Sequence, residues 1–437
     1  MTSLLSGRSI QKRIIMKANN NLLLIFLIAT FCSLVLIFGW GVIELYDSAS
    51  YIKAWDSFSD GHLDALRTPV YPFLLHLFFI IFGSASYLKA IIVFQHIIFL
   101  LSVLFFNRLL RFHTKSERTI FWLSLLYAVL PCFNSWNNCI LTESLALSGS
   151  IFLLYLTSKI FEKPSLSQAF LYTLQLLFLL FLRPIFLYML PVLLIASMTL
   201  FFIRKKRRSG LLIISGTLAS CVCICIYMKE FHNEYGLYTT SSSGIINQYY
   251  IARQYNILDP SIASDASLKE DINRYFLTNG KFLKDETIIW DEATNIVSKH
   301  KFRSIQQCIS ESFRNQPLLS LTSIRLRLIK AGQAPLFFSA IWDISSVFYI
   351  VGCNLSSLFL FLLLYSVFLI SWIIKKKSLP WNTFLCYLLG VSSIIISIIG
   401  AQNEWNRLIL PSMPIWGIMV AQVCSLLHIR KETIVLK

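Results

Sequence analysis

The amino-acid sequence predicts an all-α protein that crosses a membrane about ten times. Of its 437 residues, 56% are hydrophobic and only 14% are charged, and the mean hydropathy is +0.65. A soluble domain of this length would carry more charge. Many apolar stretches reach the roughly 18–20 residues that a helix needs to span a bilayer. These stretches are continuous and do not alternate with polar residues, so the expected spans are helices.

Ten stretches have the length and composition of spans. They cover residues 21–43, 87–106, 119–133, 140–158, 168–182, 184–203, 210–228, a span within 346–374, 379–400 and 408–428. The first is too long for the core of a signal peptide, and no small-residue cleavage site follows it. We therefore expect it to remain as an anchor.

Basic residues gather in alternate connections between these spans. Clusters such as Arg204 to Arg208 and Lys375 to Lys377 fall on the side that also holds both termini, whereas the short loops on the other side hold few. This distribution follows the positive-inside rule, so it accounts for the net charge of +17 without a nucleic-acid partner. It predicts a multi-pass protein of the bacterial inner (cytoplasmic) membrane with cytoplasmic N- and C-termini.

The remaining segments are expected on the extracytoplasmic side. Residues 70–82 are apolar but too short to cross comfortably, so they predict a helix in the outer interface, preceded by an amphipathic surface helix over 47–66. Residues 229–335 form one long hydrophilic loop region with mixed short helices, including one over 285–301. The sequence thus divides into an N-terminal membrane module, 1–228, whose first outer loop (44–86) carries the site, then 229–335, then C-terminal helices in 336–437.

On this topology a set of ionisable and aromatic side chains meets at the outer membrane level. The set comprises Asp47, Arg67, Tyr71, Glu143, Arg183, Glu404 and Arg407. Ionisable groups near a bilayer are costly and tend to be functional. An arginine can bind a phosphate bidentately, and a facing carboxylate can accept the proton of an incoming hydroxyl. Such a pair could transfer a sugar from a lipid phosphate. The chain has neither of the usual glycine-rich nucleotide-binding loops.

Each of these residues also has a purely structural interpretation. Asp47 could cap the surface helix. Glu143 could lie at a helix N-terminus because the helix dipole stabilises a negative charge there. The arginines could reach lipid headgroups, and Tyr71 could anchor a helix at the interface. We interpret Asp47 and Glu143 as catalytic, and the others as binding the donor phosphate and headgroup.

Five short motifs occur in a recognisable order along the chain. They are Asp-Ser-x-x-Tyr from Asp47, Arg-Thr-Pro-x-Tyr-Pro from Arg67, Leu-Thr-Glu-Ser-Leu-Ala-Leu from Leu141, Leu-Arg-Pro from Leu182, and Asn-Arg-Leu-Ile-Leu-Pro from Asn406. In this order the chain resembles the GT-C glycosyltransferase superfamily, in its protein O-mannosyltransferase and aminoarabinose-transferase branch. The resemblance covers about residues 20–200 and, more loosely, the last two spans.

The resemblance implies a polyprenyl-phosphate sugar donor and a reaction on the extracytoplasmic side. It implies that Asp47 is the catalytic base, Glu143 a second acid, and Arg407 a ligand of the lipid phosphate. The chain departs from the family at two motifs. Asp47 is followed by Ser48, where family members often have a second acid. Near the end of the chain the sequence Glu-Trp-Asn-Arg, which ends at Arg407, stands where a Glu-Arg-Tyr sequence is common. We therefore expect no metal and no other cofactor, although the pattern leaves a divalent metal open.

The predicted function is that of an integral-membrane glycosyltransferase. It would move a hexosyl or pentosyl group from a polyprenyl-phosphate donor to a lipid, glycan or protein acceptor. Two alternatives stay open: a polysaccharide polymerase or ligase, and a non-enzymatic transporter of lipids or oligosaccharides. A polymerase or ligase should carry arginines in two long outer loops, and a transporter should carry ionisable residues at mid-bilayer.

Overall fold

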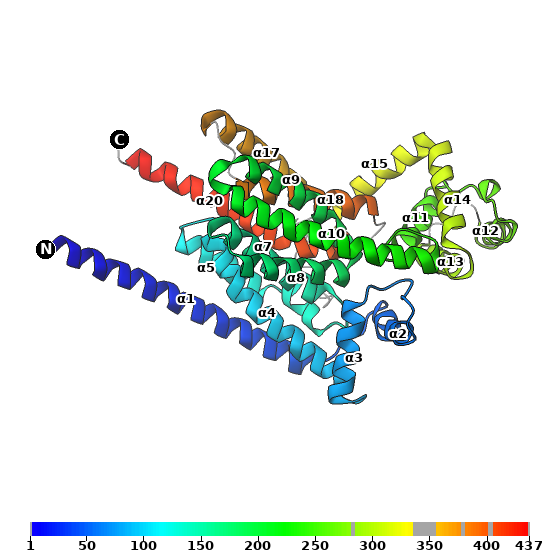
Figure 1. Ribbon diagram of the computed structural model, residues 1–437, viewed down its shortest axis with the longest axis horizontal. Helices are drawn as coiled ribbons and strands as arrows, with labels where there is room; N and C mark the ends of the chain where they lie inside the picture. Colours follow the sequence, from blue (N-terminus) through cyan, green and yellow to red (C-terminus); the bar gives the residue numbers. More distant parts are fainter. Residues whose placement is uncertain (1, 281–284, 335–354, 377–380, 401–404, 436–437) are drawn as a thin grey trace.

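A computed structural model describes residues 2–280, 285–334, 355–376, 381–400 and 405–435, and nearly all of these residues are helical (Figure 1). The helices up to the first long connection are α1 (Thr2–Trp40), α2 (Ser48–Ser59), α3 (Val70–Phe82), α4 (Tyr87–Arg111), α5 (Glu117–Val129), α6 (Pro131–Asn134), α7 (Glu143–Glu162), α8 (Leu166–Leu182), α9 (Met189–Phe202) and α10 (Arg207–Tyr235). They are followed by α11 (Ser243–Gln254), α12 (Ala266–Asn279), α13 (Glu286–Lys299), α14 (Phe302–Asn315), α15 (Pro317–Gln333), α17 (Leu355–Lys376), α18 (Trp381–Gly400), α19 (Trp405–Ile409) and α20 (Met413–Val435).

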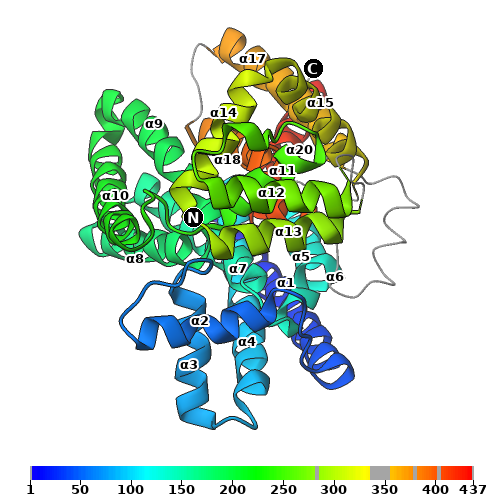
Figure 2. The ribbon, with the colours of Figure 1, turned by 90° about the vertical axis from the view of Figure 1, so that its right-hand side faces the viewer.

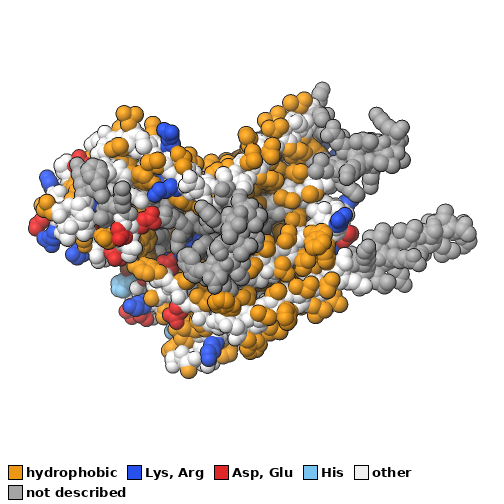
Figure 3. All heavy atoms as spheres, turned by 180° about the vertical axis from the view of Figure 1, so that it is seen from behind, with side chains coloured by type: hydrophobic (Ala, Val, Ile, Leu, Met, Phe, Trp, Pro, Cys, Tyr) orange, Lys and Arg blue, Asp and Glu red, His pale blue; other side chains and the backbone are white. Residues whose placement is uncertain are grey.

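The described chain is a multi-pass membrane protein by the length and composition of its helices. Eight helical stretches are long and apolar enough to span a bilayer, and a ninth is bent. The prediction of about ten spans corresponds to these nine plus α8, which has 17 residues and is therefore short for a span. Hydrophobic side chains cover most of the bundle surface, and many charged ones gather at the end that carries α11–α15 (Figure 3).

The predicted third span, 119–133, is bent in the structure. The chain bends by 57° between α5 and the segment that begins at Pro131. Leu130 is extended, with φ −68° and ψ 124°. Proline has no N–H to continue the helix and disfavours the helical conformation of the preceding residue, so α5 ends there.

The core of the bundle is α7, which packs against α4, α8 and α10. Close approach to α8 is possible at two glycines: a Cβ on Gly149 of α7 would lie 2.8 Å from a Leu179 methyl, and one on Gly216 of α10 would lie 2.6 Å from Thr173 Oγ1. Small residues at contacts are how membrane helices pack without a hydrophobic driving force between them. This tight centre fixes the first residue of α7, which belongs to the site described below.

The first outer loop contains two helices, as predicted, but the first of them is shorter than expected. The surface helix predicted over 47–66 ends at Ser59, because Gly61 adopts φ 83° and turns the chain into an irregular segment. The interfacial helix, α3, has the predicted bounds Val70–Phe82 and ends at Gly83, φ 71°. The irregular segment between α2 and α3 holds Arg67.

Residues 243–333, the α11–α15 region, form a helical unit with its own hydrophobic cluster. Figure 2 looks at the bundle from that end and shows α11, α12 and α13 lying across it. The helix predicted over 285–301 is α13, whose first N–H groups are capped by Asp285. Helix α10 continues past residue 228 and ends at Tyr235, and residues 236–242 connect it to α11. The division into three domains stays a prediction.

The first outer loop lies against the same end of the bundle. Ser242 N–H donates to the Ala65 carbonyl at 2.7 Å, and Leu63 N–H donates to Glu234 Oε2 at 2.9 Å. The Tyr235 hydroxyl also donates to the Leu63 carbonyl. The α11–α15 region and the first loop therefore face the same side of the membrane.

Candidate active site

Two carboxylates and three guanidinium groups form one alternating chain of ion pairs. Arg67 Nη2 lies 2.7 Å from Asp47 Oδ1, and Arg407 Nη2 lies 2.9 Å from the other Asp47 oxygen. The Nε of Arg407 donates to Glu143 Oε1, and Arg183 Nη1 lies 3.0 Å from that same oxygen. The order is Arg67, Asp47, Arg407, Glu143, Arg183, and we call this set the ion network. Five residues predicted to meet at the outer membrane level are thus in contact.

Asp47 is positioned by the backbone immediately before α2. Its carbonyl accepts hydrogen bonds from the N–H groups of Ser50 and Tyr51, whereas its carboxylate makes no capping bond. Asp47 therefore occupies the N-cap position of α2, but its side chain does not cap the helix. The carboxylate is instead turned toward the two arginines.

Arg67 is held by three residues to which the sequence analysis gave no role. Asp64 Oδ1 accepts from the Arg67 backbone N–H at 2.6 Å, Ser50 Oγ accepts from Arg67 Nε at 2.8 Å, and the guanidinium lies 4.1 Å above the Tyr51 ring. The Asp-x-x-Arg spacing is typical of a turn closed by the aspartate side chain, and it was the available signal. These contacts point the guanidinium at Asp47.

Glu143 is the first residue of α7 and is fully buried. A short β-bridge between Ile43 and Cys139 ties the segment before Asp47 to the segment before Glu143. The Asn138 side chain strengthens this tie by donating to the carbonyls of Leu36 and Gly41, at 2.9 and 2.7 Å. Asp47 and Glu143 are 96 residues apart in the sequence, and these local bonds bring them together.

Arg183 and Arg407 complete the network from the other side. Arg183 follows α8 and precedes Pro184, which keeps it extended (φ −149°, ψ 132°) and directs it away from the helix axis. Arg407 lies in the short helix α19 and is only 8% exposed. Both guanidinium groups contact carboxylates, so the interpretation of these arginines as reaching lipid headgroups does not describe them. Glu404, also predicted for the site, lies outside the described residues.

Tyr71 lies behind the network and is not a member of it. The side chain is fully buried, and its hydroxyl donates to Gln95 Oε1 at 3.0 Å. Its ring meets the edge of the Tyr51 ring with centroids 5.3 Å apart. The alternative that Tyr71 anchors the helix at the membrane interface is wrong, because an interface anchor would be exposed at one end. Tyr71 therefore packs against Tyr51, and the ring of Tyr51 in turn contacts the Arg67 guanidinium.

The electrostatics of the network set what it can do. Three cations face two anions, so the set carries one net positive charge. Burial alone would raise the pKa of the Asp47 carboxyl, but the charges of Arg407 and Arg67 and their hydrogen bonds hold it below its ordinary value. Asp47 is also the most accessible member, with 23% of its side chain exposed, against 14% for Arg67 and none for Glu143. An anionic substrate would therefore meet the network at Asp47 and Arg67.

Metal ligands were also sought around the network. Within the part of the chain that the structure describes, no group of three or more His, Cys, Asp or Glu side chains is placed to hold a metal ion. The expectation that the protein needs no metal and no other cofactor stays a prediction.

Comparison with solved structures relates this fold to a known one. The archaeal oligosaccharyltransferase AglB from Archaeoglobus fulgidus, in complex with an inhibitory peptide and a dolichol-phosphate, is similar over 94% of this chain with a TM-score of 0.52 and 14% sequence identity. A second structure of the A. fulgidus oligosaccharyltransferase, tethered to an acceptor peptide, covers 91% of this chain with a TM-score of 0.49 and 12% identity. The chain spans about half the length of these proteins.

No family model and no curated protein matches the chain by sequence. The likeness to AglB shows the fold. The chain shares the all-α polytopic fold of AglB, and this confirms the all-α polytopic fold that the sequence predicts.

Proposed function

We propose that the protein is an integral-membrane glycosyltransferase that takes a sugar from a polyprenyl-phosphate donor. The acceptor is a lipid, a glycan or a protein on the extracytoplasmic side. The main observation that supports this proposal is that Arg407 forms ion pairs with both Asp47 and Glu143. A guanidinium held by two acids and open to the outside through Asp47 is poised to exchange one of them for a phosphate.

The reaction follows from that exchange. The donor phosphate binds Arg67 and Arg407, and the carboxylate of Asp47 loses a cationic partner, so its pKa rises and it becomes a stronger base. The acceptor oxygen attacks the anomeric carbon as its proton passes to Asp47. The bond between that carbon and the phosphate oxygen breaks, and the leaving polyprenyl phosphate keeps the electron pair. The arginines stabilise the charge that develops on the phosphate. Glu143 and Arg183 hold the other side of Arg407.

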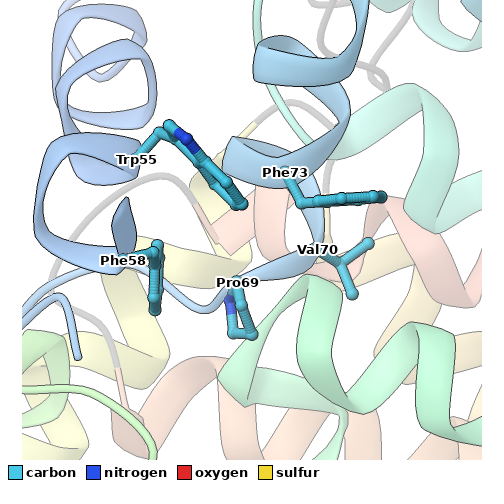
Figure 4. A pocket seen from close by; sticks show the side chains of 5 residues that line it. All are labelled: Trp55, Phe58, Pro69, Val70 and Phe73. Carbon is cyan, nitrogen blue, oxygen red and sulfur yellow. The ribbon is translucent and has the colours of Figure 1, made fainter. Parts of the chain in front are cut away.

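An apolar groove beside Arg67 supports a lipid donor. It is lined by Trp55, Phe58, Pro69, Val70 and Phe73 and encloses about 360 Å³ (Figure 4). These residues come from α2, from the start of α3 and from the segment between them, and Pro69 is two residues from Arg67. An isoprenoid chain whose phosphate bound the arginines could extend along this groove, because the side chains that line it are aliphatic or aromatic.

The side of the membrane and the compartment belong to the same proposal. The first loop and the α11–α15 region lie at one end of the bundle, and the basic clusters predict that the opposite end is cytoplasmic. This supports a protein of the bacterial inner membrane with cytoplasmic termini. The ion network lies at the ends of α7 and α8, whereas a transporter would be expected to hold its ionisable groups at mid-bilayer.

The proposal is tested by transfer in vitro from radiolabelled polyprenyl-phosphate sugars with protein in lipid vesicles. Asp47→Asn should reduce kcat/KM by about 10²- to 10⁴-fold, which is the usual contribution of a general base. Asp56→Asn is the matched control, because Asp56 is an exposed aspartate of the same loop, on α2. Full activity in the Asp47 variant would remove Asp47 as the base, and no transfer by the wild type from any such donor would overturn the function.

A further inference from the structure

The α11–α15 region contains a second cavity, which we call the outer cavity, and no member of the ion network lines it. It encloses about 610 Å³ between the end of α11, α12 and the junction of α14 with α15. This volume is within the range of small-molecule sites, which is about 300–1,000 Å³. Its polar and aromatic lining residues are Tyr255, Asn256, Asp259, Asn273, Phe276 and Gln316.

The polar groups of the outer cavity are available to a ligand. Within the described part of the chain, the side-chain amides of Asn256, Asn273 and Gln316 make no hydrogen bond. Asp259 Oδ1 accepts from Ser261 N–H and Oγ, at 2.9 and 2.7 Å, and Oδ2 has no partner among the same residues. An amide both donates and accepts, and a carboxylate accepts, so the set is complementary to hydroxyl groups, which do both.

The apolar part of the lining is aromatic and held in place. The guanidinium of Arg253 lies 4.1 Å from the centre of the Phe276 ring and is itself fixed by a buried ion pair with Glu292. The ring of Tyr255 also lines the cavity. Aromatic rings pack well against the C–H faces of sugar rings, because the ring faces are apolar and electron-rich.

The charge of the lining discriminates among ligands. Among the described residues that line the outer cavity none is basic, and the one carboxylate is that of Asp259. A phosphate, sulfate or carboxylate ligand would lack a cationic partner there. A peptide ligand commonly adds to a strand edge or lays an amphipathic helix in an apolar groove. The described residues of this region offer no strand edge, and the cavity lining is mixed rather than apolar.

We infer that the outer cavity binds an uncharged oligosaccharide. On the proposed function, on which this assignment rests, the oligosaccharide is the acceptor glycan or the glycan part of a larger acceptor. The amides and Asp259 hydrogen-bond its hydroxyl groups, and Tyr255 and Phe276 pack against its rings. The ion network carries out transfer, and the outer cavity selects what receives the sugar.

The test is a binding experiment on the full chain in detergent micelles. The protein is applied to a microarray of neutral oligosaccharides, of sulfated and sialylated ones, and of peptides. The strongest neutral ligand is then titrated against the wild type and variants. The double variant Asn273→Ala, Gln316→Ala should weaken binding at least tenfold, since two hydrogen bonds of about 1 kcal/mol each are removed and tenfold corresponds to about 1.4 kcal/mol.

Two controls separate this inference from the proposed function. Asn295→Ala changes an exposed helical asparagine on α13 that does not line the cavity, and it should leave the affinity unchanged. Asp47→Asn should bind the neutral ligand like the wild type although transfer is lost. Binding of only anionic glycans or only peptides, no binding of any neutral glycan, or equal affinity in the double variant would each overturn the inference. Transfer by a wild type that binds no neutral glycan would leave the proposed function intact.

Discussion

Two parts of the molecule bury arginine against glutamate, and they do it in different ways. In the α11–α15 region Arg253 and Glu292 are both fully buried, and each has further partners: Tyr249 donates to Glu292 Oε1 at 2.8 Å, and Arg253 donates to the Gly280 carbonyl at 2.7 Å. In the ion network one arginine is divided between two acids, and one of these acids reaches solvent. The pair of Arg253 and Glu292 has no access to solvent, and we call it the closed pair. In the ion network, Arg407 could exchange Asp47 for a substrate anion. Burial of a charged pair does not by itself mark a functional site, and the proposed function rests on the shared arginine and on the access through Asp47.

The largest expected effect is on the closed pair. Arg253→Ala should destabilise the protein by about 3–5 kcal/mol, because it leaves the Glu292 carboxylate buried without its cation. Thermal unfolding and hydrogen exchange of α11–α13 would measure the loss. Arg274→Ala is the control, since Arg274 pairs with Glu270 on the surface and such pairs contribute little. Equal protection of α11–α13 in the Arg253 variant and the wild type would show that the pair is not structural.

The shared arginine should behave in the opposite way. Arg407→Lys keeps the charge but cannot donate in parallel to Asp47 and Glu143, so kcat/KM for transfer should fall about 10²- to 10³-fold. Resistance to trypsin should remain close to that of the wild type, because Arg183 and Arg67 still pair with the two acids. Arg325→Lys, at an exposed position of α15, serves as the matched control. A variant that unfolds but, when folded, transfers normally would make Arg407 a structural residue like Arg253.

A smaller effect concerns pH. The pKa of Asp47 is lowered by Arg407 and Arg67 against the opposing effect of burial, so its contribution to stability is present above the unfolded pKa of about 3.9 and is lost as the pH falls through the lower folded value. The fall of kcat/KM at acidic pH, its acidic limb, should accordingly occur at a lower pH than it would for an aspartate with the ordinary pKa. In Arg67→Gln the limb should move to higher pH, because one of the cations that lower this pKa is removed. An unchanged limb would show that the group that titrates in kcat/KM is not Asp47.

Much of the fold could be predicted from the sequence, because hydropathy and chain breakers act locally. The interfacial helix of Val70–Phe82 and the stop at Gly83 follow from a short apolar run and one glycine. Proline breaks a helix, so Pro131 was a signal for the bend, but hydropathy alone shows only one apolar span there. The early end of α2 depends on Gly61 within a polar stretch, where hydropathy gives no guide.

Five of the seven predicted site residues form the ion network, but the contacts among them could not be predicted. Topology alone placed Asp47, Glu143, Arg67, Arg183 and Arg407 at one membrane level. Which guanidinium meets which carboxylate depends on the β-bridge at Ile43 and on how α7 packs, and neither is visible in a linear sequence. The pair of Arg253 and Glu292 was missed for the same reason, since it depends on how α11 lies on α13.

The position of Arg407 along the chain has a consequence for biogenesis. This arginine is synthesised 360 residues after Asp47 and 264 residues after Glu143, when most of the earlier helices have already left the ribosome. Until α19 and α20 are inserted, both acids lack the cation that joins them. On the proposed function, a nascent protein is therefore inactive until α19 and α20 have entered the bilayer.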